Sequence, residues 1–140
     1  MNVTGNWNPT LSSTQIIEAG NDYNATLSSS TNQTLLTHSL GGGFFNQLFG
    51  GWQVNIQRID SNWNPALQLE IRRTGVGSST IFSGINGGTI YQQVSPSSTI
   101  FYTGRGNFNN VPMQYRLQGM SVTLPVGTYS TTIIYTLLDN

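Results

Sequence analysis

The chain contains a single histidine, His38, which a hydrolase of the serine type would need as its general base. His38 lies in the segment T-L-L-T-H-S-L and alternates with Leu36 and Leu40, the pattern of a strand with one apolar face. The adjacent Ser39 would point to the opposite face of such a strand, so the two side chains do not form a nucleophile–base pair. We therefore interpret His38 as a structural residue.

Acidic residues are few and isolated, which argues against a metal site. The five carboxylates are Glu18, Asp22, Asp60, Glu70 and Asp139. Calcium and magnesium need several oxygen ligands close together, and neither residues 21–22 nor residues 60–62 supply enough of them. A carboxylate pair for glycoside hydrolysis stays open as an alternative, because such a pair forms in space rather than in sequence. Five arginines balance the five acids, so salt bridges are the simpler interpretation.

Cysteine and lysine are both absent, and further classes of chemistry depend on them. Without cysteine there are no disulfides, thiolate nucleophiles or cysteine-bound zinc. Without lysine, the glycine-rich segments 41–51 and 104–106 do not complete a phosphate-binding loop. The sequence therefore predicts a protein that is not an enzyme and uses no metal or cofactor.

The surface is expected to carry very little charge. Charged residues make up 7% of the 140 residues, against about 25% in ordinary soluble domains. The net charge is zero, which favours self-association and leaves no basic patch for a nucleic acid. A composition rich in hydroxyl and amide side chains predicts an exported protein of the cell surface. No apolar run approaches the roughly 20 residues of a membrane-spanning helix, and Met1–Thr4 lack the features of a signal peptide.

Many short segments alternate between apolar and polar residues, and no helical period persists over ten residues. Strands are expected at residues 2–8, 14–19, 24–30, 33–40, 52–59, 67–72, 80–82, 89–94, 99–103, 111–117, 120–124 and 129–138. Two hairpins are predicted, one joining 52–59 to 67–72 and one joining 120–124 to 129–138, with residues 104–110 as a long loop. Frequent turn signals between short strands predict a single antiparallel β-sandwich domain over residues 1–140, Ig-like or jelly-roll-like.

Three stretches are candidates for a subunit interface. In residues 1–10, Val3, Gly5 and Trp7 share one face of a short strand that is ended by Pro9; this strand either pairs with a neighbouring subunit or is the first strand of its own sandwich. Between two glycine clusters, Phe44, Phe45, Leu48 and Phe49 either tuck under the sandwich or insert into a neighbouring subunit or a membrane surface. The third stretch is the apolar C-terminal strand with Tyr135 and Leu137.

Aromatic residues also suggest a sugar-binding alternative. Trp52 alternates with Val54 and Ile56, so we expect it in the core. Trp7 and Trp63 each lie in the tetrapeptide N-W-N-P, which suggests a repeated strand-end turn, and their rings are the candidates for stacking on a sugar. Glycosylation sequons at Asn2, Asn24 and Asn32 occur at the frequency that composition alone predicts, so glycosylation stays undecided.

The segment Pro125–Tyr129 and the strand after it, with Tyr135-Thr136-Leu137, follow an earlier Trp52-Gln53-Val54. Over about residues 50–140 this pattern resembles bacterial surface β-sandwich domains of the WxL kind and fimbrial or spore-coat-type subunits. Val54 stands where the WxL motif has leucine, and Tyr135 where the late motif has tryptophan. The resemblance implies a noncatalytic protein that polymerises. We thus expect a structural subunit of an extracellular filament, pilus or coat, with a module binding cell-wall polysaccharide as the alternative.

Overall fold

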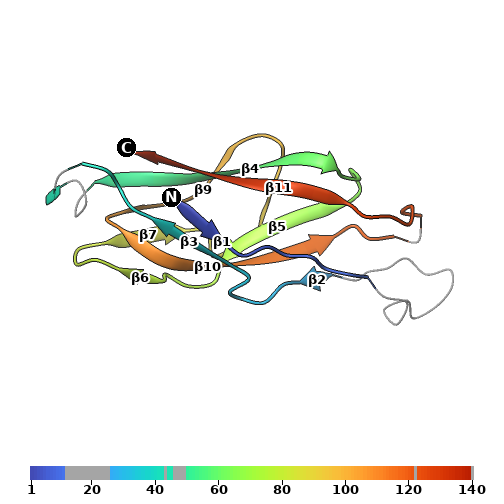
Figure 1. Cartoon of the computed structure of the whole chain (residues 1–140), viewed down its shortest axis with the longest axis horizontal. Helices are drawn as coiled ribbons and strands as arrows, with labels where there is room; N and C mark the ends of the chain where they lie inside the picture. Colours follow the sequence, from blue (N-terminus) through green and yellow to red (C-terminus); the bar gives the residue numbers. More distant parts are fainter. Residues whose placement is uncertain (12–25, 43, 46–49, 122, 140) are drawn as a thin grey trace.

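The computed structural model of the chain describes residues 1–11, 26–42, 44–45, 50–121 and 123–139. Within these ranges the secondary structure consists of strands, apart from a helical backbone at Phe44 and Phe45 (Figure 1). The strands are β1 (Asn2–Thr4), β2 (Leu27–Ser28), β3 (Thr34–His38), β4 (Gly51–Asn62), β5 (Gln68–Arg73), β6 (Ser78–Ser79), β7 (Gly84–Gly87), β8 (Gln92–Gln93), β9 (Thr99–Arg105), β10 (Phe108–Gln118) and β11 (Ser130–Asp139).

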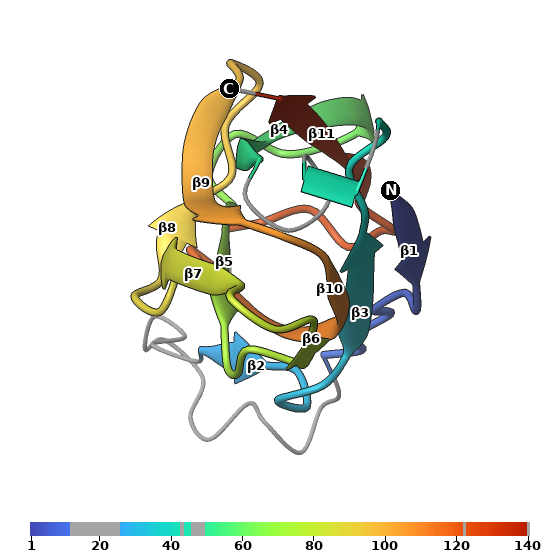
Figure 2. The ribbon, with the colours of Figure 1, turned by 90° about the vertical axis from the view of Figure 1, so that its left-hand side faces the viewer.

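The strands form two antiparallel sheets that pack face to face. Sheet A has the order β1-β3-β10-β5-β8, with the short strands β2 and β6 also paired to β10. Sheet B has the order β11-β4-β9-β7. Viewed along the strands, β1 of sheet A and β11 of sheet B lie on the same side of the sandwich (Figure 2). The predicted all-β antiparallel sandwich is confirmed.

Strand alternation selects the core residues. In β4, Trp52, Val54 and Ile56 are buried, while the residues between them lie on the outer face of sheet B. Their burial confirms the prediction that Trp52 is a core residue. The apolar side chains buried with them from other strands include Leu36, Leu69, Ile71, Phe101, Val111, Met113 and Tyr115. Burying each large apolar side chain contributes about 1.5–3 kcal/mol to stability.

Both predicted hairpins are wrong. β4 belongs to sheet B and β5 to sheet A, so residues 63–67 cross from one sheet to the other. At the C-terminus, β11 pairs with β4 along its whole length. The described residues of segment 120–124 form no strand, because β10 ends at Gln118 and Gly119 follows it. Gly119 has a φ of +80°, and a Cβ there would lie 2.0 Å from the carbonyl oxygen of Ala66.

Two loop assignments also differ from the sequence prediction. The long polar loop expected at 104–110 is a tight turn, because β9 extends to Arg105 and β10 begins at Phe108. Gly106 makes this turn with a φ of +76°. The strand expected at 80–82 is itself a turn between β6 and β7. The predicted strand at 14–19 lies outside the described residues, and the one at 24–30 is described only in part, where it contains β2.

Candidate functional site

The structure separates the predicted interface residues into three places. Val3 belongs to β1, Gly5 and Trp7 follow it, and Tyr135 and Leu137 belong to β11. Phe44 and Phe45 lie in the connection between β3 and β4, and Leu48 and Phe49 fall outside the described residues.

The N-terminal strand β1 pairs with β3 of the same chain through three residue pairs, Asn2↔Thr37, Val3↔Leu36 and Thr4↔Leu35. All three residues of β1 are exposed. The predicted alternation through Gly5 does not continue, because Gly5 has a φ of +104° and turns the chain. β1 is thus a short strand at the edge of sheet A, held by few contacts.

Trp7 anchors the N-terminal segment beyond β1. Its ring stacks on Tyr115 of β10, with ring centroids 5.9 Å apart and planes 13° apart. The Tyr115 hydroxyl donates to the Thr34 hydroxyl at 2.7 Å and lies 2.9 Å from the hydroxyl of Tyr135 on β11. Burial raises the pKa of both tyrosines, so both hydroxyls stay protonated. Trp7 and Tyr135 therefore both contact Tyr115, which links the N-terminal segment to β11.

β11 is an open edge of sheet B. Its ten residues pair with β4 on one side, and among the described residues no strand pairs with its other side. Tyr135 and Leu137 are half-buried against the core, so β11 offers a neighbour its free backbone edge and its outward side chains. Native edges are blunted by lysine, proline, bulges or short length. Between Thr131 and Leu138 the strand is regular and has no charge, proline or glycine.

The other sheet edges are much shorter. β1 and β8 end sheet A with three and two residues, and β7 ends sheet B with four residues that include two glycines. Such short strands expose few backbone groups to a neighbour. β11 is therefore the sheet edge best suited to accept another strand. Its open position depends on sheet order, which the local sequence pattern does not report.

The two candidate sugar-stacking rings are each held against their own chain. Trp63 donates its indole N–H to the carbonyl oxygen of Leu67 at 3.2 Å, and the Arg58 guanidinium lies 5.1 Å from its ring centroid. Trp7 uses one face of its ring on Tyr115. These contacts explain why both rings are half-buried and pack against the core. They give Trp7 and Trp63 structural roles at the ends of strands.

His38 lies in an aromatic part of the core. It is 1% exposed, and its ring centroid lies 4.3 Å from that of Trp52, 5.7 Å from that of Phe108 and 5.9 Å from that of Tyr102. Burial, with a smaller contribution from the N-terminal ammonium, lowers the pKa of His38 to about 4. Neither ring nitrogen has a hydrogen-bond partner among the described residues. The neutral imidazole is therefore a packing element between the two sheets.

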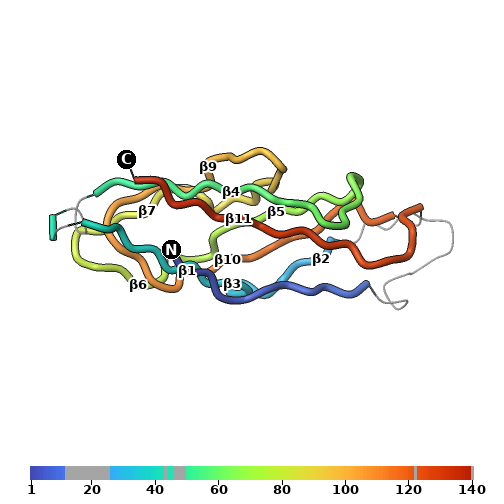
Figure 3. The backbone as a smooth tube through the Cα atoms, turned by 45° about the horizontal axis from the view of Figure 1, so that its top comes forward, coloured from blue at the N-terminus to red at the C-terminus, as the bar shows by residue number. Residues whose placement is uncertain are grey.

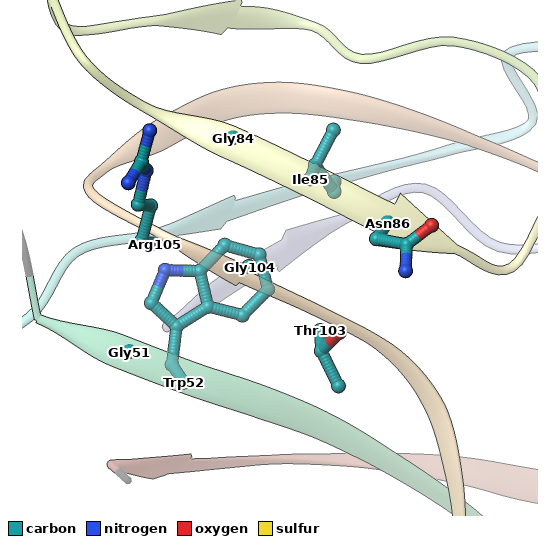
Figure 4. Close-up of a pocket in the computed structure, with 8 residues that line it drawn as sticks. All are labelled: Gly51, Trp52, Gly84, Ile85, Asn86, Thr103, Gly104 and Arg105. Carbon is teal, nitrogen blue, oxygen red and sulfur yellow. The ribbon is translucent and has the colours of Figure 1, made fainter.

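A shallow hollow of about 600 Å³ lies where β4, β9 and β7 run side by side (Figure 4). It is lined by Gly51, Trp52, Gly84, Ile85, Asn86, Thr103, Gly104 and Arg105. Gly104 lets the Trp52 indole pack closely, since a Cβ there would lie 2.5 Å from the indole ring. Among the described residues that line the hollow, Arg105 is the one ionisable side chain, so these residues supply no acid–base pair. Nor do the described residues contain a cluster of three or more metal-ligating side chains.

The aromatic connection between β3 and β4 is exposed where the structure describes it. Phe44 and Phe45 are 71% and 76% exposed and contact each other edge to face, with centroids 5.8 Å apart. The interpretation that the connection tucks its aromatic residues under the sandwich is wrong for these two. Sequence reasoning missed a second exposed pair, Ile81 and Phe82, because it placed them in a strand.

The described part of the chain contains no helix long and apolar enough to cross a bilayer.

The features that could carry a function are the β11 edge, the N-terminal segment beside it and the exposed apolar residues of the loops. Comparison with protein-family models, with curated proteins and with solved structures finds no match to this chain.

Proposed function

We propose that the chain is a noncatalytic structural subunit that assembles with its own copies into an extracellular filament or coat. The observation that carries the proposal is the open edge of β11, a strand of ten residues that is regular from Thr131 onward and whose only charge is Asp139 at its end. Strand addition at such an edge supplies main-chain hydrogen bonds for affinity, and the side chains on either face set the register. The extracellular location rests on the low charge and the absence of lysine.

The N-terminal segment is the proposed donor strand. Its release from β3 would break three register pairs and the stacking of Trp7 on Tyr115. β1 and β11 lie on the same side of the sandwich, so a segment released by one copy leaves from beside the edge that accepts a neighbour (Figure 2). A carbohydrate-binding module has less support, because the rings of Trp7 and Trp63 already pack on their own chain.

Two lysines on the edge strand test the proposal. In β11, Thr132 and Thr136 are exposed, so Thr132→Lys with Thr136→Lys adds two charges without entering the core. We expect fibres of the unchanged chain in negative-stain microscopy and none from this double variant. The matched control places the same charges away from β11, with Ser97→Lys and Asn109→Lys, and should still form fibres. Circular dichroism verifies that each variant is folded.

Fibres from the β11 double variant, or a monodisperse unchanged chain at high concentration, would overturn the proposal. A variant lacking residues 1–10 then identifies the donor. If this variant assembles as before, the N-terminal segment is not exchanged and β11 pairs with a different strand of the neighbour. If assembly stops while the variant stays folded, adding a synthetic peptide of residues 1–10 should block the assembly of the full chain by occupying the edge.

A further inference from the structure

One end of the sandwich carries four large exposed apolar side chains on two loops. Phe44 and Phe45, in the connection from β3 to β4, are 71% and 76% exposed; Ile81 and Phe82, between β6 and β7, are 76% and 61% exposed. We call these four residues the apolar tip. Single exposed apolar residues are common on protein surfaces, whereas a group of large ones marks a contact with a membrane or another protein.

Hydrogen bonds tie both loops to the same turn, which joins β9 to β10. On one side, the Leu40 amide donates to the Asn107 side-chain oxygen at 3.0 Å, and the Gly106 amide donates to the Gly50 carbonyl at 3.2 Å. On the other side, the Thr80 amide donates to the Asn107 carbonyl at 3.4 Å. The two apolar pairs are therefore brought to the same end by the fold, although nearly forty residues separate them along the chain.

The backbone at Phe82 is also unusual. Phe82 has a φ of +65°, in the left-handed region that residues other than glycine, asparagine and aspartate rarely adopt. Strained backbone conformations of this kind concentrate at functional sites. Here the conformation belongs to a tight turn in which the Thr80 and Ser83 hydroxyls lie 2.8 Å apart, while the large side chain stays exposed.

The surroundings of the tip are nearly uncharged. Arg105 ends β9 at this end of the molecule, and among the described residues it has no acidic partner. Asp139 lies in register with Trp52 at the same end of sheet B. One cationic and one anionic side chain leave no net side-chain charge for electrostatic attraction to an anionic surface. Contact at the tip must therefore depend on its apolar side chains.

We propose that the apolar tip inserts into the interfacial region of a lipid bilayer. Residues 44–45 and the turn between β6 and β7 lie at one end of the long axis of the molecule rather than on a sheet face, so the tip forms a protruding contact (Figures 1 and 3). A protruding group of apolar side chains enters a deformable lipid interface without needing a complementary cavity, and its affinity grows with the apolar area it buries. A zwitterionic bilayer is a sufficient partner, because charge does not drive the contact.

Flotation with phosphatidylcholine vesicles tests the inference on the full chain. We expect the protein to float with the vesicles equally at low salt and at roughly 0.5 M salt, where surface charges are screened within a few ångströms. Phe44→Ser with Phe45→Ser should weaken partitioning about tenfold or more. Ile81→Ser with Phe82→Asn should do the same, and asparagine tolerates the left-handed backbone at position 82.

The matched control removes two apolar side chains outside the tip that are more exposed than the tip residues, with Ile90→Ser and Val126→Ser, and should float like the unchanged chain. No flotation of the unchanged chain, loss of its flotation at high salt, or flotation of either tip variant to the same extent as the unchanged chain would overturn the inference. If the tip variants instead change the oligomeric state in light scattering without vesicles, the tip is a contact between copies. The β11 lysine variant should float normally, which keeps this test separate from the assembly test.

Discussion

Two groups of aromatic and apolar residues border the Gly106–Asn107 turn; one group is buried and the other is exposed. On the inner side, His38, Trp52, Tyr102 and Phe108 are buried between the sheets. Trp52 even donates its indole N–H to the Gly106 carbonyl at 2.7 Å. On the outer side, the four residues of the apolar tip lie on loops that are hydrogen-bonded to the same turn, and each is more than half exposed.

The contrast follows from the backbone that carries each group. The four buried rings lie on strands, where alternation directs every second side chain between the sheets. The tip residues lie outside the strands, on connections to which this alternation does not apply. Burial of a large apolar residue therefore reflects its backbone position as much as its hydrophobicity, and the two groups should respond differently to substitution.

Trp52→Ala should have the largest effect on stability. Removing a fully buried aromatic side chain leaves a cavity and deprives the Gly106 carbonyl of its donor, so we expect a loss of about 3–5 kcal/mol. Urea unfolding monitored by circular dichroism measures this loss. A loss below about 1 kcal/mol would mean that the four buried rings do not hold the two sheets together.

Acid should lower the free energy of unfolding by protonating His38, one of the four buried rings. Its pKa is lowered to about 4 in the folded chain, so the unfolded chain, with a histidine pKa near 6.5, binds the proton more tightly. The stability from neutral His38 is therefore complete above about pH 6.5 and is lost as the pH falls toward 4, by about 3 kcal/mol at most.

The comparison variant for this prediction is His38→Phe, which keeps an aromatic ring but removes the titrating group. Its free energy of unfolding should change less than that of the unchanged chain between about pH 6.5 and pH 4. Parallel pH profiles for the two proteins, measured by urea unfolding at several pH values, would show that His38 does not control this transition.

The same contrast explains how far the sequence could predict the fold. The alternation of Trp52, Val54 and Ile56 indicated both a strand and its buried face, because that information is local. Strand partners are not local. The connection at residues 63–67 suits a hairpin or a crossing between sheets, and the sequence prediction chose the hairpin. At the C-terminus, Gly119 follows the end of β10, the described residues of 120–124 form no strand, and β11 pairs with β4, which is far away in the sequence.

The candidate sites were predictable only in part, for similar reasons. Apolar character at Tyr135 and Leu137 identified the C-terminal strand, but its position as an open edge depends on the order of all four strands in sheet B. Phe44 and Phe45 were predicted as candidate interface residues because glycine clusters flank their segment in the sequence. Ile81 and Phe82 resembled a short strand because isoleucine and phenylalanine favour strands, whereas tertiary contacts at the Gly106–Asn107 turn held them in a turn.

The smallest effect on stability is expected at the tip. Phe44→Ser with Phe45→Ser removes two aromatic rings, yet the free energy of unfolding should change by no more than about 0.5 kcal/mol, because these rings are already exposed to water. Urea unfolding under the conditions used for Trp52→Ala gives the direct comparison. A loss of about 2 kcal/mol or more would place these rings in a packed environment and remove the distinction between the two groups, because only a buried ring is expected to cost that much when deleted.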